Sequence, residues 1–228
     1  MFRDRAEAGR MLGAEIAGLK LREPIVLALP RGGVPVACEV AAAVDARLDL
    51  VIIRKVGAPD NPELAVAALV DGDPPDVVLN REIIEAYGLD DAEIAALIAR
   101  ERPELQRRRA VYRRRRAPLS VKGKSVIVVD DGAATGTTMK VAARAIRRRS
   151  PASVILALPV ASADAISDLQ QESDKVVCLS QPPRFRALGY HYRDFHQLDD
   201  AEVLDLLATA RNREASRRSR LAGREQAV

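Results

Sequence analysis

A strand, an acidic turn and a helix start follow one another in residues 126–139, and this order constrains the fold more than any other part of the chain. Four β-branched residues predict a buried strand, and the small-residue turn after Asp130 and Asp131 leads into a helix that begins near Thr137. Backbone N–H groups at a helix N-terminus bind anions. Ligands of open α/β sheets bind at the carboxyl ends of strands, where the two carboxylates lie. We therefore expect a phosphorylated ligand that also carries hydroxyl groups or a divalent cation.

A second loop of the same kind follows the apolar run at residues 25–30. The sequence there is Pro-Arg-Gly-Gly, and Arg31 can make charge-assisted hydrogen bonds to a phosphate. Gly32 and Gly33 allow the backbone to approach a ligand closely. Such a turn is weak evidence alone, but a second strand–loop–helix unit in one sheet favours phosphate binding.

Two cations close the next predicted strand, at residues 48–53. Arg54 and Lys55 would lie at the carboxyl end of this strand, on the ligand side of the sheet. The alternative interpretation is an ordinary solvated strand end, and the sequence favours neither.

Strands that alternate with helices along the chain predict a parallel sheet. Further buried strands are expected at residues 153–158 and 175–179. We predict an α/β fold: a parallel-sheet core with helices on both faces, an inserted helical lobe and a small C-terminal hood. The expected organisation is a single domain at residues 1–210 with the inserted lobe at 81–117, followed by an arginine-rich disordered tail at 211–228.

Seven arginines lie in the run at residues 107–116. Basic stretches of this kind can bind nucleic acid. Tyr112 is the run's one aromatic residue, and no nucleic-acid-binding module surrounds it. A solvated or partner-facing helix is the favoured interpretation, and nucleic acid remains the alternative.

Composition narrows the class of protein. Aromatic residues make up 3% of the chain and Trp is absent, so the core must be aliphatic. The formal net charge of +4 suits anionic ligands and is equally compatible with ordinary solubility. Cys38 and Cys178 lie in apolar surroundings, which predicts buried free thiols in a reducing compartment.

The N-terminal residues carry charges that interrupt any apolar run, and no apolar stretch reaches transmembrane length. We therefore expect a cytoplasmic protein without a membrane segment. We also expect a homo-oligomer.

The loop after the strand at residues 126–129 resembles the phosphoribosyl diphosphate motif of the type I phosphoribosyltransferases. The residues that match are Asp130, Asp131, Thr135, Gly136 and Thr138. The chain contains neither a Walker A loop nor the dinucleotide fingerprint. Over residues 2–208 it is similar to the bacterial group of predicted phosphoribosyltransferases whose substrate is not assigned.

The resemblance implies a role for each motif residue. Asp130 and Asp131 would hold the ribose hydroxyls and favour positive charge at the anomeric carbon, and Arg31 would hold the departing diphosphate. These three are the predicted catalytic residues. The predicted binding residues for phosphoribosyl diphosphate are Arg31, Gly32, Gly33, Arg54, Lys55, Asp130, Asp131, Ala134, Thr135, Gly136, Thr137 and Thr138.

Magnesium and an acceptor complete the implied site. Mg²⁺ would be bound mainly through substrate oxygens and water, so no side chain is assigned as a metal ligand. An aromatic stretch near the C-terminus is similar to the base-stacking segment of the purine-specific members, which assigns Phe185 and Tyr190 to the acceptor. His191 and His196 are candidate acceptor contacts or acids, although structural roles are favoured for both.

The implied activity is transfer of 5-phosphoribosyl to a nitrogen acceptor, for which a purine-like base is one candidate, with release of diphosphate. The alternative is a regulatory protein that senses phosphoribosyl diphosphate or a nucleotide, because fold does not fix function. An intact acid pair together with an intact diphosphate loop favours turnover.

Overall fold

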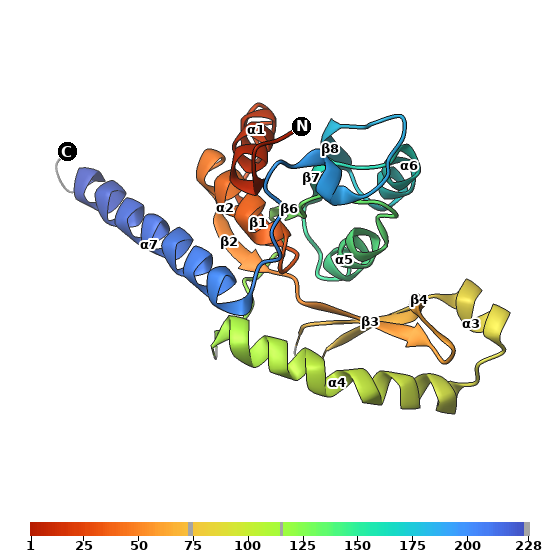
Figure 1. The fold of residues 1–228 in the computed structure, drawn as a ribbon. Coiled ribbons are helices and arrows are strands. Elements are labelled where there is room, and N and C mark those ends of the chain that lie inside the picture. Colours follow the sequence, from red (N-terminus) through yellow and green to blue (C-terminus); the bar gives the residue numbers. More distant parts are fainter. Residues whose placement is uncertain (73–74, 115, 226–228) are drawn as a thin grey trace.

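The computed structural model describes residues 1–72, 75–114 and 116–225. Its centre is a five-stranded parallel sheet (Figure 1), as the alternating strands and helices predict. In spatial order the strands are β2 (Arg47–Leu50), β1 (Pro24–Ala28), β6 (Ser125–Val129), β7 (Ser153–Val160) and β8 (Lys175–Ser180).

Helices cover both faces of this sheet, which confirms the predicted fold class. On one face lie α1 (Arg5–Ala17), α2 (Gly33–Ala43) and the first part of α7 (Asp200–Glu225). On the other face lie α5 (Thr137–Arg147) and α6 (Ala163–Glu172).

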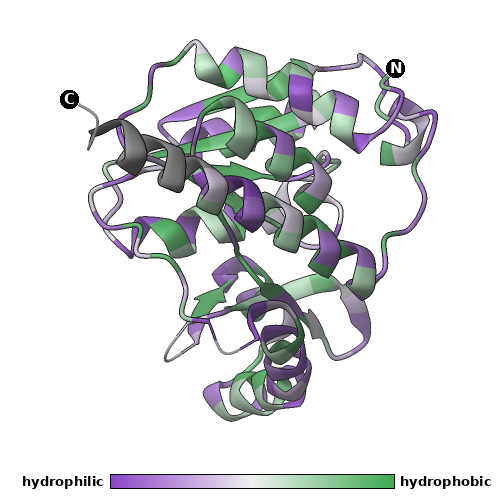
Figure 2. Cartoon of the chain, turned by 90° about the vertical axis from the view of Figure 1, so that its left-hand side faces the viewer, coloured by the Kyte–Doolittle hydropathy of each residue, from purple (hydrophilic) through white to green (hydrophobic). Residues whose placement is uncertain are grey.

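The apolar runs of the sequence become the two halves of the core. Val26 and Ala28 of β1 face α1 and α2, while Ile25 and Leu27 face α5. Because both faces are covered, successive residues are all buried, and this is why the strands read as unbroken apolar runs. Figure 2 shows hydrophobic strands in the middle of the molecule and hydrophilic residues on the surrounding helices.

A second lobe leaves the core after β2. It contains the antiparallel sheet of β3 (Ile53–Ala58), β4 (Asn61–Val70) and β5 (Asp76–Leu79) and the helices α3 (Arg81–Tyr87) and α4 (Asp91–Arg113). α3 and α4 lie in the stretch predicted as an inserted helical lobe, but the observed lobe starts earlier, at β3, and includes a three-stranded sheet. α4 begins with a capping box, in which Asp90 and Glu93 each bind the other's backbone N–H.

Arg113 ties the end of α4 to the core. Its Nη1 donates to Asp49 Oδ1 at 2.9 Å, its Nη2 donates to the Leu50 carbonyl at 2.9 Å, and its Nε contacts Asp71. Asp71 and Arg113 are buried. The carboxylates of Asp49 and Asp71 therefore offset the cost of removing the Arg113 charge from water.

The strand predicted at residues 48–53 is shorter than expected, and the placement of Arg54 and Lys55 at its end is wrong. β2 ends at Leu50, and the chain turns into β3, where Ile53 pairs with Val70 of β4. Apolarity alone does not mark this turn, because the apolar run continues across it.

The final helix extends into the predicted tail. The sequence predicted disorder from residue 211, whereas α7 continues to Glu225. Residues 211–225 are rich in Ala, Arg and Glu and contain no Pro, and these residues favour helix regardless of charge. Residues 226–228 lie outside the described residues.

Within the described ranges, no helix is both long and apolar enough to span a membrane.

Candidate functional site

The acidic turn lies at the carboxyl end of β6, where the sequence placed it. All five residues of β6 are buried, Asp130 is half-buried and Asp131 is 6% exposed. Gly136 caps α5 with a φ of +68°, in the left-handed region that favours glycine. The turn is therefore fixed between a buried strand and a helix start.

Contacts to β7 and α6 hold the small-residue part of this turn. The Ala133 N–H donates to the Val160 carbonyl at 3.0 Å, and Ser162 Oγ donates to the Ala134 carbonyl at 2.6 Å. The hydroxyl oxygens of Thr135 and Thr137 lie 3.1 Å apart at the start of α5. Hydroxyl groups and a helix N-terminus thus converge, which is an arrangement suited to a phosphate.

The glycine loop after β1 packs directly against the acid pair. A Cβ atom at Gly32 would lie 2.1 Å from Asp131 Oδ2, and one at Gly33 would lie 2.6 Å from the Val129 carbonyl oxygen. Only glycine fits at either position. The two loops that the sequence identified separately are therefore neighbours in one site.

Arg31 lies at the mouth of this site, and its peptide bond with Pro30 is cis. Its guanidinium is 40% exposed, and Nη1 lies 3.9 Å from Asp200 Oδ1 at the start of α7. The charge of Arg31 is thus available to solvent and to an anionic ligand.

Arg5, at the start of α1, is a site residue that the sequence reasoning missed. Its Nε donates to Asp131 Oδ2 at 2.7 Å, and its Nη1 donates to the His196 carbonyl at 3.0 Å. The guanidinium lies 3.9 Å from the Phe195 ring centroid. Both partners of the ion pair are buried. No local signal could have revealed this contact, because 126 residues separate Arg5 from Asp131.

Burial shapes the charge of the acid pair. Removal from water raises the pKa of Asp130 well above its ordinary value, and the neighbouring Asp131 charge raises it further. Burial also raises the pKa of Asp131, but the Arg5 guanidinium opposes that rise. Arg5 therefore favours the ionised form of Asp131.

The aromatic C-terminal segment packs beside the acid pair. Tyr192 Oη donates to the Asp131 carbonyl at 2.6 Å, and the Tyr192 ring stacks on Phe195 with centroids 5.1 Å apart. The predicted acceptor residues differ in exposure: Phe185 is partly buried against His191, whereas Tyr190 is 65% exposed. Tyr190 is thus the more exposed of the two predicted acceptor residues.

Of the two cations after β2, only Lys55 approaches the phosphate loop. A cavity of about 230 Å³ lies between the β3–β5 sheet and α5, and it is lined by Lys55, Thr135, Thr137 and Thr138 among others. Arg54 instead forms an ion pair with Glu101 of α4.

The described residues contain no group of three or more His, Cys, Asp or Glu side chains placed to hold a metal ion. The acid pair offers carboxylate oxygens beside the glycine loop, and such oxygens are the ligands that hard cations prefer.

A model of the phosphoribosyl transferase domain matches residues 5–188. The chain belongs to this family. Two Mycobacterium tuberculosis proteins, from strains H37Rv and CDC 1551 / Oshkosh, are each 41% identical to it over 210 residues, which is 92% of this chain and 47% of theirs. The first is named "Putative phosphoribosyl transferase Rv0571c". The chain spans about half the length of these curated relatives.

A solved structure supports the fold over nearly the whole chain. The crystal structure of TT1426 from Thermus thermophilus is 42% identical, with a TM-score of 0.82, and the match covers 91% of this chain and 97% of that one.

Proposed function

We propose that this protein transfers the 5-phosphoribosyl group of phosphoribosyl diphosphate to a nitrogen acceptor and releases diphosphate. The observation that carries this proposal is the contact between the two loops. Gly32 and Gly33 lie against Asp131 and Asp130. One ligand could therefore place its diphosphate on the glycine loop and its ribose on the acid pair. Family membership supports transfer as the reaction class.

The acid pair would hold the ribose hydroxyls. One oxygen of each carboxylate is already engaged: Asp130 Oδ1 accepts from the Asp131 N–H, and Asp131 Oδ2 accepts from Arg5. We assign the other two oxygens to the ribose. Fixed negative charge there would also stabilise positive charge at the anomeric carbon as diphosphate leaves.

In the proposed reaction the C1–O bond to diphosphate breaks and a C1–N bond to the acceptor forms. Diphosphate takes the bonding electrons, and the proton of the acceptor nitrogen passes to solvent. Arg31 would bind the departing diphosphate, and bound Mg²⁺ would neutralise part of its charge. The remaining contribution is positioning of the two reactants.

Phe185 and Tyr190 are the proposed acceptor residues. The exposed Tyr190 ring could stack on a planar base, and a purine-like base is the acceptor we propose first. Lys55 and the hydroxyls of Thr135, Thr137 and Thr138 would surround the 5-phosphate in the cavity beside α5.

Gly32→Ala should weaken phosphoribosyl diphosphate binding by about tenfold or more. The new methyl group would displace the Asp131 carboxylate, and overpacking of this kind costs about 1–3 kcal/mol. Gly18→Ala is the matched control, because a Cβ there is 3.3 Å from its nearest neighbour. Calorimetric titration with the Mg²⁺ complex checks both variants. Equal affinity of Gly32→Ala and wild type would contradict the packing argument.

As the pH is lowered, turnover should be lost at a higher pH than protonation of an ordinary Asp carboxylate would predict. The pKa of Asp130 is raised, so this group takes up a proton as pH falls through a value above about 3.9, and the protonated form no longer supports positive charge. The dependence of kcat/KM on pH shows this limb. A limb centred at or below the ordinary Asp value would contradict the assignment.

An acceptor screen tests the function itself. Diphosphate release from Mg²⁺–phosphoribosyl diphosphate is measured with free nucleobases and small amines in turn. Release that depends on one acceptor supports the transferase. Tight ligand binding with no release for any acceptor would replace it with the sensing protein.

A further inference from the structure

Two arginine-rich segments that are distant in the sequence meet in the fold. Residues 107–113 of the arginine-rich run form the end of α4, Arg114 caps the helix, and α7 begins beside it (Figure 1). The ion pair between Arg107 and Asp200, at 3.4 Å, joins the two helices. Arg211 of α7 lies close enough to feel the charges of Arg114 and Arg116. We call Arg114, Arg116 and Arg211 the arginine cluster.

The acidic side chains around this cluster are already occupied. Asp49 accepts two hydrogen bonds from Arg113 Nη1, at 2.9 and 3.2 Å, and one from the Leu119 N–H at 2.8 Å. Glu214 pairs with Arg47 at 3.1 Å. Among the described residues, none of the three cluster arginines forms an ion pair.

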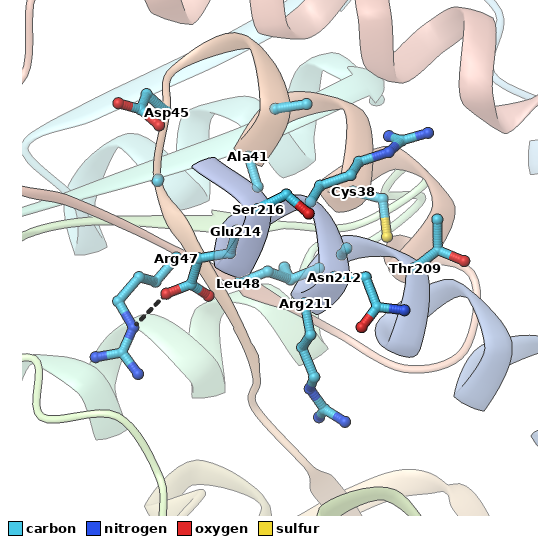
Figure 3. A pocket seen from close by; sticks show the side chains of 14 residues that line it. Cys38, Ala41, Asp45, Arg47, Leu48, Thr209, Arg211, Asn212, Glu214 and Ser216 are labelled. Carbon is cyan, nitrogen blue, oxygen red and sulfur yellow. Dashed lines mark ion pairs between the residues drawn. The ribbon is translucent and has the colours of Figure 1, made fainter. Parts of the chain in front are cut away.

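The position of Arg211 makes this lack of a partner costly. Its side chain is half-buried, and it points away from Cys38 in the groove of about 700 Å³ between α2, β2 and α7 (Figure 3). Burial lowers the pKa of Arg211, and the nearby Arg116 and Arg114 lower it further. An anion bound to these guanidinium groups would relieve the repulsion between their positive charges, which partial burial of Arg211 strengthens.

The arrangement favours an extended polyanion over a small one. Positive charge continues away from the cluster along α7, whose sequence carries arginines at 213, 217, 218, 220 and 224. In α4, by contrast, Arg107, Arg108 and Arg109 are already paired with carboxylates. At about 1.5 Å per residue, positions 211–225 of α7 span about 21 Å, the reach of several consecutive phosphates. Both segments offer guanidinium groups, which suit phosphate, and few aromatic rings for base stacking.

We propose that the arginine cluster and the adjoining face of α7 form a docking surface for the phosphate backbone of a nucleic acid. Recognition there is electrostatic and independent of base sequence, because the surface carries charge without groups for base readout. The surface uses none of the residues assigned to the proposed ligand site, so it does not depend on the proposed transferase activity.

Fluorescence anisotropy with a labelled oligonucleotide of random sequence, single-stranded and duplex, tests this proposal on the full chain at several salt concentrations. Three phosphate contacts predict a slope of log K against log salt of about −3. Arg116→Glu/Arg211→Glu should weaken binding by about tenfold or more and reduce the slope by about 2. Diphosphate release should be unchanged.

A charge-matched control separates a local surface from net charge. Arg10→Glu/Arg22→Glu changes the formal charge by the same amount at exposed positions in and after α1, and it should retain wild-type binding. Equal loss in both double variants would overturn the proposal, as would binding to vesicles of anionic phospholipid but not to the oligonucleotide. Full competition by inorganic phosphate at the same phosphate concentration would also overturn it, since that would indicate a small-anion site.

Discussion

Asp130→Asn/Asp131→Asn should reduce the rate of diphosphate release by at least about a thousandfold. Both changes keep the size of the side chain and remove the negative charge that would face the anomeric carbon, and one preorganised electrostatic contact is worth about 10²–10³ in rate. Loss of two charge-assisted hydrogen bonds to the ribose should also weaken ligand binding by about a hundredfold.

The control for this variant is Asp164→Asn/Asp205→Asn, which makes the same change at exposed positions on α6 and α7. It should keep wild-type kinetics. Steady-state kinetics and calorimetric titration of both double variants give the answer. Wild-type ligand affinity in Asp130→Asn/Asp131→Asn would show that the ligand binds elsewhere.

Arg5→Met should lower kcat/KM by about ten- to a hundredfold and move the acid limb of its pH dependence upward. The Arg5 charge lowers the pKa of both Asp130 and Asp131, so without it the acid pair takes up a proton at a higher pH. Arg5→Lys keeps the positive charge but loses the planar guanidinium that donates to both Asp131 and the His196 carbonyl. Compared with Arg5→Met, it should restore part of the rate and bring the acid limb most of the way back to its wild-type pH.

Stability must be measured alongside, because removing one partner of a buried ion pair costs about 3–5 kcal/mol. Urea unfolding of both Arg5 variants shows how much of the effect is structural. An acid limb that stays in place in Arg5→Met would reduce Arg5 to a packing residue, whatever the loss of stability. Arg5→Lys keeps this test open if Arg5→Met does not fold.

The sequence was informative wherever the signal was local. Short stretches of sequence predicted the core strands, the two loops at the strand ends and the helices after β5, because burial on both faces and turn chemistry act on consecutive residues. The acid pair and the glycine loop were correctly placed at the carboxyl edge of one sheet.

The rest depended on contacts between distant residues. Arg5 reaches Asp131 only because α1 packs across the sheet, and nothing near Arg5 in the sequence indicates this. Arg54 looked like a ligand residue because β2 and β3 form one apolar run, yet the turn between them directs it to Glu101. The length of α7 was underestimated because charge was taken as a sign of disorder, although the same residues favour helix.

The central claim is that the two loops form one site for a ligand phosphorylated at both ends. Competition calorimetry with Mg²⁺ tests it most directly, using phosphoribosyl diphosphate, ribose 5-phosphate and inorganic diphosphate. The two-loop site predicts that phosphoribosyl diphosphate binds more tightly than either fragment and that each fragment displaces it. Displacement by ribose 5-phosphate alone, with no effect of diphosphate, would contradict the assignment of Arg31, Gly32 and Gly33 and leave only the loop after β6 as a ligand site.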